Sequence, residues 1–296
     1  HTLTQFSFPW LSFGNTQTYN LSKIQFIEFT GVYGLSFWIC SVGALLFYLI
    51  EKIKSGEWKI SSAKTIITVI IILAIYFAPD VYTLTRGSKA KYENAFTNGE
   101  ISIGVVQPNS DPWERWGSKQ MQFVTDYVDM IKQLKEKNPQ TKLVILPETA
   151  ITFYLFNTIN LEKYLKIKNF VDSANTPLLV GLPYYKIYKD STEAPVDAKR
   201  SNDGAYYDTF NAALLFEKNK TQAEYQVYKK NKLVIGGERV PYQEVLGFLK
   251  DYVTWQVGIS QWQIGKDTNN FVLEDGTQFN TAICYESVYP EYFSAF

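Results

Sequence analysis

The segment LVILPETA, at residues 143–150, decides the fold class of this chain. Four apolar residues in succession predict a short buried strand, which runs directly into Pro147 and the acidic Glu148. Similar short apolar runs lie at 101–106 and 178–182, and helix-forming segments separate them. Because strands that alternate with helices are typical of α/β proteins, we expect an α/β domain over residues 98–296.

Two helices and two hairpins are expected around this segment. Ser118 can cap the first helix, and Asn138-Pro139 stops it. The second helix is predicted over 161–173. The expected hairpins pair 209–216 with 224–229, and 271–273 with 278–283.

Two further stretches interrupt this pattern. Residues 190–204 are polar and predict a mobile loop. Residues 243–255 are amphipathic, and two structures remain open for them. They can form a helix packed on the domain, or an element that lies on a membrane beside the site.

Polar side chains follow three of the predicted strands. Glu148 follows the first, Lys230 lies in the segment 228–234, and Cys284 is expected to end the last strand. Active sites of α/β folds commonly gather at strand ends. Taken singly, each residue more often has a structural role, as a core cysteine, a helix-cap glutamate or a surface lysine. Together they supply a nucleophile, a base and a cation.

The histidine and cysteine content narrows the chemistry. The single histidine is His1, at the end of the chain, which excludes schemes that need a histidine inside the fold. The base for a cysteine nucleophile must then be a carboxylate or a lysine. We expect no disulfide between Cys40 and Cys284, because Cys40 lies in an apolar run. Two cysteines and one histidine cannot build the usual zinc site, and we expect no metal.

Two apolar runs predict transmembrane helices, at about 30–50 and 65–84. The first run has no charged residue, which favours a membrane span over the alternative of a buried core helix. The lysine-rich loop 51–64 is predicted to lie in the cytoplasm. Three basic residues after the second run argue for the opposite orientation. We expect a membrane region over residues 1–97, with the remainder of the chain outside the cytoplasm.

Composition agrees with a membrane protein. Basic and acidic residues balance at 29 each, which lacks the basic excess of nucleic-acid binders. Aromatic residues make up 16%, and Trp and Tyr are frequent at membrane interfaces. The chain begins at His1 without Met and ends soon after Cys284, so we interpret it as an internal fragment.

Five motifs occur together in an order known from one family. They are FPWL at 8–11 with FG at 13–14, VQPN at 106–109 with RW at 115–116, LPETA at 146–150, YKK at 228–230 with GE at 237–238, and AICYE at 282–286. In these five motifs the chain resembles the apolipoprotein N-acyltransferases of bacterial envelopes. That family belongs to the nitrilase superfamily, also called the carbon–nitrogen hydrolase superfamily. It departs from them at Lys232, where the family usually has histidine, and at 235–237, where it usually has Pro-Phe-Gly.

The resemblance implies a role for each matching residue. Glu148 would be the general base, Lys230 the oxyanion-stabilising lysine and Cys284 the acylated nucleophile. The supporting residues would be Glu238, Glu286, Tyr285 and Trp116. The implied fold is the nitrilase-like α-β-β-α sandwich, truncated at its C-terminus and preceded by two transmembrane helices. No organic cofactor is implied.

The resemblance also implies a reaction and a location. An acyl chain would pass from a phospholipid, through a thioester on Cys284, to the N-terminal amine of a diacylated lipoprotein. The protein would be a multi-pass protein of the bacterial inner membrane, with its catalytic domain on the periplasmic side. Two alternatives remain open: a membrane-tethered nitrilase-like amidase or hydrolase with the same three residues, and a non-catalytic envelope scaffold.

Overall fold

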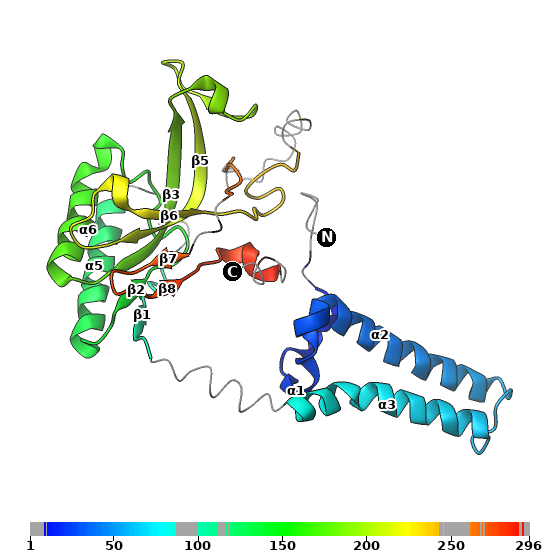
Figure 1. The fold of residues 1–296 in the computed structure, drawn as a ribbon. Coiled ribbons are helices and arrows are strands. Elements are labelled where there is room, and N and C mark those ends of the chain that lie inside the picture. Colours follow the sequence, from blue (N-terminus) through cyan, green and yellow to red (C-terminus); the bar gives the residue numbers. More distant parts are fainter. Residues whose placement is uncertain are drawn as a thin grey trace. The chain divides into compact units, whose positions relative to one another are not determined.

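The chain divides into two compact units in a computed structural model, shown in Figure 1. One unit is Phe8–Glu100 and the other contains Ile101–Phe296. The structure describes residues 9, 11–86, 100–111, 117, 119–242, 245, 261–266, 268, 270–289 and 292. Trp116 and the stretch 243–255, except for Val245, therefore lie outside the described residues.

The first unit is a helical hairpin with two short helices before it. Its elements are η1 (Phe13–Gln17), α1 (Leu21–Ile24), α2 (Ile27–Lys54) and α3 (Ala63–Arg86). By length and composition, α2 and α3 can each cross a membrane. In the most apolar 18-residue stretch of each helix, only 11% of α2 and 17% of α3 is buried. The core helices of a soluble protein would be mostly buried. Both helices contain the predicted spans and extend beyond them at each end.

A proline and an ion pair explain how the hairpin is held together. Pro79 lies inside α3 and has no N–H for the carbonyl of Ile75, four residues earlier. The indole nitrogen of Trp38 in α2 donates to that carbonyl at 2.8 Å. Lys23 of α1 is buried, forms an ion pair with Asp80 of α3 and lies 4.0 Å from the centre of the Tyr76 ring.

The second unit is built on one mixed, six-stranded sheet with the order β1-β2-β3-β5-β4, and with β6 also paired to β5. The strands are β1 (Ile103–Val105), β2 (Leu143–Ile145), β3 (Leu178–Tyr188), β4 (Lys199–Arg200), β5 (Tyr206–Phe216) and β6 (Gln226–Lys229). The first three strands are parallel, and β5 is antiparallel to β3, β4 and β6. A mixed α/β fold was expected from the sequence, and the structure has one.

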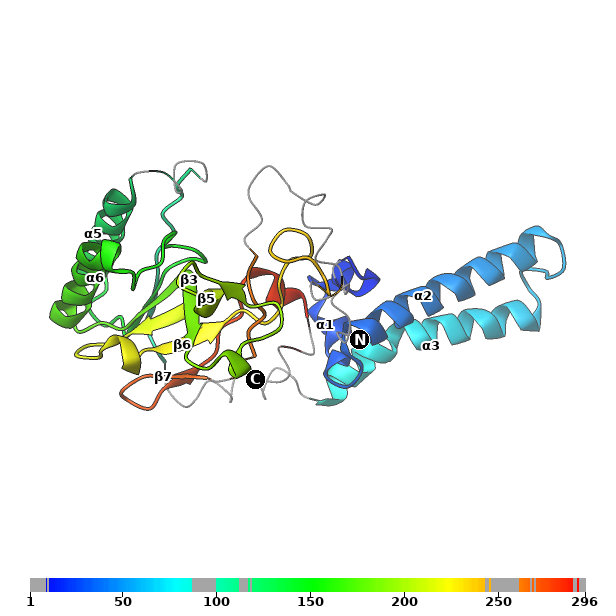
Figure 2. The ribbon, with the colours of Figure 1, turned by 90° about the horizontal axis from the view of Figure 1, so that it is seen from above.

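Helices cover one face of this sheet and a small hairpin covers the other, as Figure 2 shows for α5, α6 and β7. The covering elements are α5 (Gln120–Lys137), α6 (Leu161–Ala174), β7 (Phe271–Val272), β8 (Gln278–Phe279) and η6 (Cys284–Val288). Short helices η2 (Thr158–Asn160), η3 (Ser191–Glu193) and η4 (Gln222–Glu224) lie in the connections. Alternate residues of β2, β3 and β5 enter two separate apolar cores, one on each face.

Two expectations are corrected by the structure. Strand β3 continues to Tyr188, and it pairs with β5 over eleven residue pairs. The two strands form a ribbon whose connection, expected as a mobile loop, contains η3 and β4. Cys284 does not end a strand, because β8 stops at Phe279 and Cys284 begins η6. The sequence pattern missed this because residues 280–283 have no strand partner in the described chain.

Candidate active site

Glu148 is placed by a close approach between two backbone segments. The loop 147–149 crosses over Gly181 of β3, where an added Cβ atom would lie 2.6 Å from both the Pro147 oxygen and the Thr149 nitrogen. Only glycine fits beneath this loop. Thr149 has a φ of 52°, in the left-handed region that few residues other than glycine adopt. This turn fixes the direction in which Glu148 leaves β2.

Lys230 directly follows β6, and its side chain is only 1% exposed. Its backbone N–H donates to the carbonyl of Asn211 at 2.9 Å, and its carbonyl accepts from Gly265 at 2.8 Å. Its Nζ lies 3.0 Å from Oε1 of Glu148 and 3.0 Å from Oε1 of Glu238. The structure therefore brings the expected base, the expected cation and one supporting glutamate together.

Asn211 of β5 connects the same two carboxylates. Its Nδ2 donates to Oε1 of Glu148 at 2.6 Å and to Oε1 of Glu238 at 3.0 Å. The other oxygen of Glu238 accepts the backbone N–H of Val234 at 2.8 Å. Sequence analysis missed Asn211; the available signal was one amide, the second residue of the otherwise apolar run FNAALLF at 210–216.

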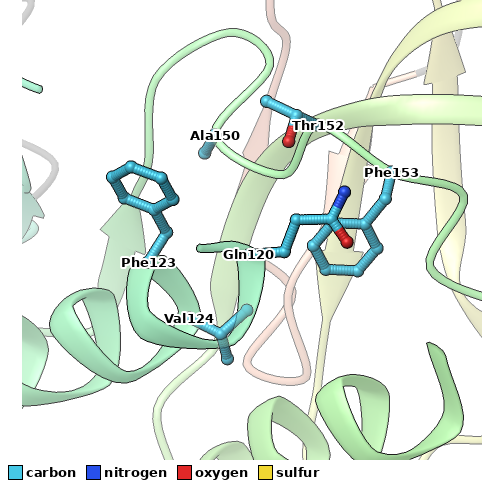
Figure 3. Close-up of a pocket in the computed structure, with 6 residues that line it drawn as sticks. All are labelled: Gln120, Phe123, Val124, Ala150, Thr152 and Phe153. Carbon is cyan, nitrogen blue, oxygen red and sulfur yellow. The ribbon is translucent and has the colours of Figure 1, made fainter. Parts of the chain in front are cut away.

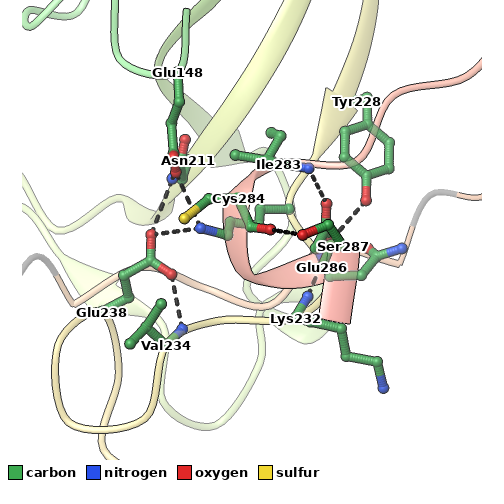
Figure 4. Close-up of polar contacts among 12 residues, drawn as sticks. Glu148, Asn211, Tyr228, Lys232, Val234, Glu238, Ile283, Cys284, Glu286 and Ser287 are labelled. Atoms are coloured by element: carbon green, nitrogen blue, oxygen red, sulfur yellow. Dashed lines mark hydrogen bonds and ion pairs between the residues drawn. The ribbon is translucent and has the colours of Figure 1, made fainter. Parts of the chain in front are cut away.

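Cys284 is exposed and points toward the carboxylates of Glu148 and Glu238, as Figure 4 shows. It is a free thiol, as is Cys40, and no disulfide joins the two. Cys284 has a φ of 50°, so the nucleophile candidate, like Thr149, sits in a left-handed turn. Such conformations are costly and cluster at functional sites.

The charges around Cys284 favour a protonated thiol at rest. Partial burial of the sulfur raises the pKa of Cys284 and the charge of Glu148 raises it further, while Lys230 lowers it. Burial alone would lower the pKa of Lys230, but the charges of Glu238 and Glu148 outweigh burial and raise it. At neutral pH, Lys230 is therefore an ammonium ion beside a neutral thiol.

Glu286 is fully buried and joins the segment after β6 to the segment that begins η6. Its Oε1 accepts the backbone N–H of Asn231 at 2.6 Å and of Lys232 at 3.1 Å, and the hydroxyl of Tyr228 at 2.6 Å. Its Oε2 accepts the N–H of Ile283 at 2.7 Å. Burial raises the pKa of Glu286 to about 7, against the pull of its backbone donors. Among the described residues, the role of Glu286 is to hold the backbone of Asn231, Lys232 and Ile283 in place by accepting their N–H groups.

The remaining expected residues lie at the border of this cluster. Tyr285 is buried, with its ring packed edge to face against Tyr289 at 5.3 Å. The Nζ of Lys232 lies 5.3 Å from the ring centre of Tyr289, and Figure 4 shows that it points away from Cys284. Lys232 therefore adds no second cation between the carboxylates.

A small pocket borders the loop that carries Glu148, and Figure 3 shows its lining. The lining residues come from α5 and from the segment after the base: Gln120, Phe123, Val124, Ala150, Thr152 and Phe153. None of these side chains is ionisable, so the pocket can pack against a substrate without adding charge to the site.

A cysteine, a glutamate and a lysine gathered on an α/β sheet are the arrangement that the sequence resemblance implied. The chain belongs to the carbon–nitrogen hydrolase family, whose family model matches residues 102–295. A second family model, the apolipoprotein N-acyltransferase N-terminal domain, matches residues 1–45. The expected superfamily is therefore confirmed, and with α2 and α3 these matches indicate a membrane protein.

Relatives of this chain carry one recurring name. The apolipoprotein N-acyltransferase of Chlorobaculum tepidum is 30% identical, over 98% of this chain and 53% of the relative. Apolipoprotein N-acyltransferase 1 of Treponema denticola is 27% identical, over 99% of this chain and 52% of the relative. The chain thus spans about half the length of the curated relatives it matches. A solved amidase from Nesterenkonia sp. has a TM-score of 0.37 at 14% identity, covering 66% of this chain and 59% of that one.

Proposed function

We propose that this chain provides the catalytic site of an apolipoprotein N-acyltransferase. The enzyme moves an acyl chain from a phospholipid to the N-terminal amine of a diacylated apolipoprotein. One observation carries the proposal: Cys284, Glu148 and Lys230 meet in a chain that also has two helices able to cross a membrane. The names of the relatives support lipoprotein acylation over plain hydrolysis.

In the first half-reaction, Cys284 attacks the ester carbonyl carbon of the phospholipid. Glu148 takes the thiol proton as the sulfur–carbon bond forms, and the carbonyl electron pair moves onto oxygen. Lys230 and a backbone N–H beside Tyr285 stabilise that oxyanion, at about 3–4 kcal/mol for each well-placed donor. The ester C–O bond then breaks, Glu148 returns the proton to the lysophospholipid oxygen, and a thioester remains.

In the second half-reaction, the lipoprotein amine attacks the thioester carbon. Glu148 accepts a proton from the nitrogen, and the carbon–sulfur bond breaks. The sulfur leaves as a thiolate and recovers its proton from Glu148. The products are an amide and the original thiol, so no external reductant or oxidant is needed.

The hydrogen bonds assign the two oxygens of Glu148 to different tasks. Among the described residues, the amide of Asn211 and the ammonium of Lys230 both donate to Oε1 of Glu148. Oε2 is then the oxygen that takes the thiol proton. A base with one oxygen held and the other directed at the nucleophile loses little entropy during proton transfer.

We place the enzyme in the bacterial inner membrane as a multi-pass protein, with the unit that contains Ile101–Phe296 on the periplasmic side. Both proposed substrates keep their acyl chains in the bilayer. Extracting a chain into water would cost about 0.8 kcal/mol for each CH₂. A pair of membrane helices on the same polypeptide supports a site that works at the bilayer surface.

Trapping the thioester tests the proposal. Full-length protein is incubated with a phospholipid that carries an acyl label, first without acceptor and then with a diacylated lipopeptide. We expect the protein to take up label that neutral hydroxylamine releases, and to pass it to the lipopeptide. Cys284→Ala should take up no label, whereas Cys40→Ala should behave as the unmodified protein.

Other outcomes separate the alternatives. Release of free fatty acid at the same rate with and without lipopeptide would indicate a hydrolase. Absence of label from a folded protein would indicate a scaffold. Either result would overturn the proposed transfer reaction.

A further inference from the structure

Asn211 touches both carboxylates of the site and has no role in the reaction as described above. We infer that Asn211 is the positioning residue that aims Glu148 at the thiol and fixes the spacing of Glu148 and Glu238. It does so by donating from one amide to one oxygen of each. This inference rests on the proposed function, because it assigns Asn211 to the same site.

The strand register explains why Asn211 can reach these oxygens. In the antiparallel pair of β5 and β6, Ala212 lies opposite Lys229. The N–H of Lys230 donates to the carbonyl of Asn211 and continues this ladder by one residue. Asn211 and Lys230 are therefore cross-strand neighbours whose side chains leave the same face of the sheet. Both project toward the face that β7 and β8 cover, as do Ala213 and Tyr228 in the core there.

The four polar groups form a closed ring. Nδ2 of Asn211 lies 2.6 Å from Glu148 and 3.0 Å from Glu238, and Nζ of Lys230 lies 3.0 Å from each of the same two oxygens. Two donors thus alternate with two acceptors. Rotating the amide by half a turn would set its oxygen against two carboxylates, so the network assigns Nδ2 to this position.

The charges in the ring show why a neutral donor is needed. Two carboxylates face one another with one ammonium, and Asn211 is only 5% exposed, so water does not supply the missing donor at this position. A second cation here would also stabilise the thiolate of Cys284 and weaken the need for a base. An amide adds hydrogen bonds without adding charge.

Loss of this donor has a predictable effect on the position of the base. Without Asn211, only Lys230 still donates to Oε1 of Glu148 among the described residues. The Glu148 side chain is then held at one point and can turn away from the thiol of Cys284. Proton transfer from the thiol slows, because it requires the carboxylate oxygen to lie within hydrogen-bond reach of the sulfur.

The experiment compares Asn211→Leu and Asn211→Ser with a matched control, Asn160→Leu, in the full-length protein. Asn160 is also buried, and its side chain bonds the Tyr154 carbonyl at 2.9 Å and Lys163 at 2.7 Å. The measurements are the rate of thioester formation at saturating phospholipid, the KM for labelled phospholipid, and the thermal unfolding midpoint. Serine retains one donor but can satisfy only one carboxylate at a time, so it also covers the case in which the leucine variant fails to fold.

We expect Asn211→Leu to slow thioester formation by about 10- to 100-fold, as for loss of a hydrogen bond to a charged group. KM should change little. Asn211→Ser should give a rate between those of Asn211→Leu and the unmodified protein, and Asn160→Leu should lower the unfolding midpoint with little change in the rate. An unchanged rate in both Asn211 variants would overturn the inference, as would an equal slowing in Asn160→Leu. If the unmodified protein forms no thioester, the proposed function fails instead, so the two failures are distinguishable.

Discussion

At Cys284, opposing charges decide when the sulfur can react. The carboxylate of Glu148 raises the pKa of the thiol and the ammonium of Lys230 lowers it, on top of the rise that partial burial causes. A thiol that is protonated at rest is protected from oxidation and alkylation, which act on the thiolate. Reactivity then depends on transfer of the proton to Glu148 when a substrate is present.

This balance predicts opposite effects for two substitutions. In a Cys40→Ala background, the rate of alkylation by iodoacetamide reports the Cys284 thiolate alone. Glu148→Gln removes the charge that raises the pKa of Cys284, so its alkylation profile should move to lower pH. Lys230→Met removes the charge that lowers the pKa, so its profile should move to higher pH. Movement of both profiles in the same direction would contradict the proposed electrostatics.

Gly181 has a steric role at the same site. Its added Cβ would meet backbone atoms of Pro147, Glu148 and Thr149 within 2.7 Å, and backbone cannot swing aside as a side chain can. We expect Gly181→Ala to displace Glu148 and to reduce acyl transfer by about 100-fold, the usual effect of a misplacement near 1 Å.

The control for this substitution is Gly43→Ala in α2. No atom lies within 4 Å of the Cβ that would be added at Gly43. Its activity and its thermal unfolding midpoint should match those of the unmodified protein. Equal activity in the two alanine variants would show that the contact at Gly181 does not place the base.

At the scale of the elements, an ion pair joins the connection between β3 and β5 to the loop that carries Glu238. Asp197 in this connection forms an ion pair with Arg239, the neighbour of Glu238, and their side chains are only 11% and 5% exposed. Asp197 also accepts from Gln263 at 3.1 Å, and Arg239 donates to the carbonyl of Trp262 at 3.1 Å. The pair thus joins three chain segments next to Glu238.

Breaking this ion pair on one side should be costly. Asp197→Asn removes the negative charge that faces the buried guanidinium of Arg239, and we expect a loss of about 3–5 kcal/mol in the free energy of unfolding. The double substitution Asp197→Leu with Arg239→Met should recover most of that loss. Thermal or denaturant unfolding in detergent measures both.

An exposed ion pair supplies the comparison. Lys142 and Asp275 lie 2.9 Å apart with side chains 54% and 43% exposed, so Lys142→Met should change stability by only about 0–1 kcal/mol. If Asp197→Asn were as mild as Lys142→Met, the pair would not hold the connection in place.

The sequence predicted the elements whose signal is local. The helices at 120–137 and 161–174 and the first three strands follow from apolar periodicity. Ser118, the expected cap of the first helix, lies outside the described residues. The outer half of β3 was not predicted because Tyr184, Tyr185 and Lys186 alternate weakly and depend on pairing with β5 for their structure.

The site was predictable only where the residue types themselves suggest chemistry. Cys284, Glu148 and Lys230 stand out because the chain has no histidine inside the fold to serve a nucleophile. Asn211 and Gly181 do not stand out, because their roles arise from neighbours that are distant in the chain and that only the sheet brings close. Glu148, for example, is 63 residues from Asn211. A strand asparagine becomes informative once its cross-strand partner is known.

At the scale of the whole molecule, two units with different surroundings share one chain. The unit Phe8–Glu100 exposes the apolar sides of α2 and α3, while the unit that contains Ile101–Phe296 has apolar cores on both faces of its sheet. This division agrees with a membrane-embedded part and a part in water.

Labelling with a membrane-impermeant maleimide tests the proposed orientation. In a Cys40→Ala, Cys284→Ala background, Val196→Cys introduces a thiol at a site that is 98% exposed in the catalytic unit. Ser55→Cys introduces a thiol in the turn between α2 and α3. In intact cells with a permeable outer envelope, we expect Val196→Cys to react and Ser55→Cys to react only after lysis. The reverse pattern would place the catalytic unit in the cytoplasm.

The contact between Trp38 and the Ile75 carbonyl bears on how the chain enters the bilayer. A carbonyl without a hydrogen-bond donor in hydrocarbon costs several kcal/mol. Pro79 removes the usual donor to the Ile75 carbonyl of α3, and Trp38 of the neighbouring helix α2 donates to that carbonyl instead. The second span, α3, is therefore less stable in lipid by itself than when it is packed against α2. We therefore expect the two helices to enter the bilayer together. The insertion machinery would retain α2 until α3 has been synthesised.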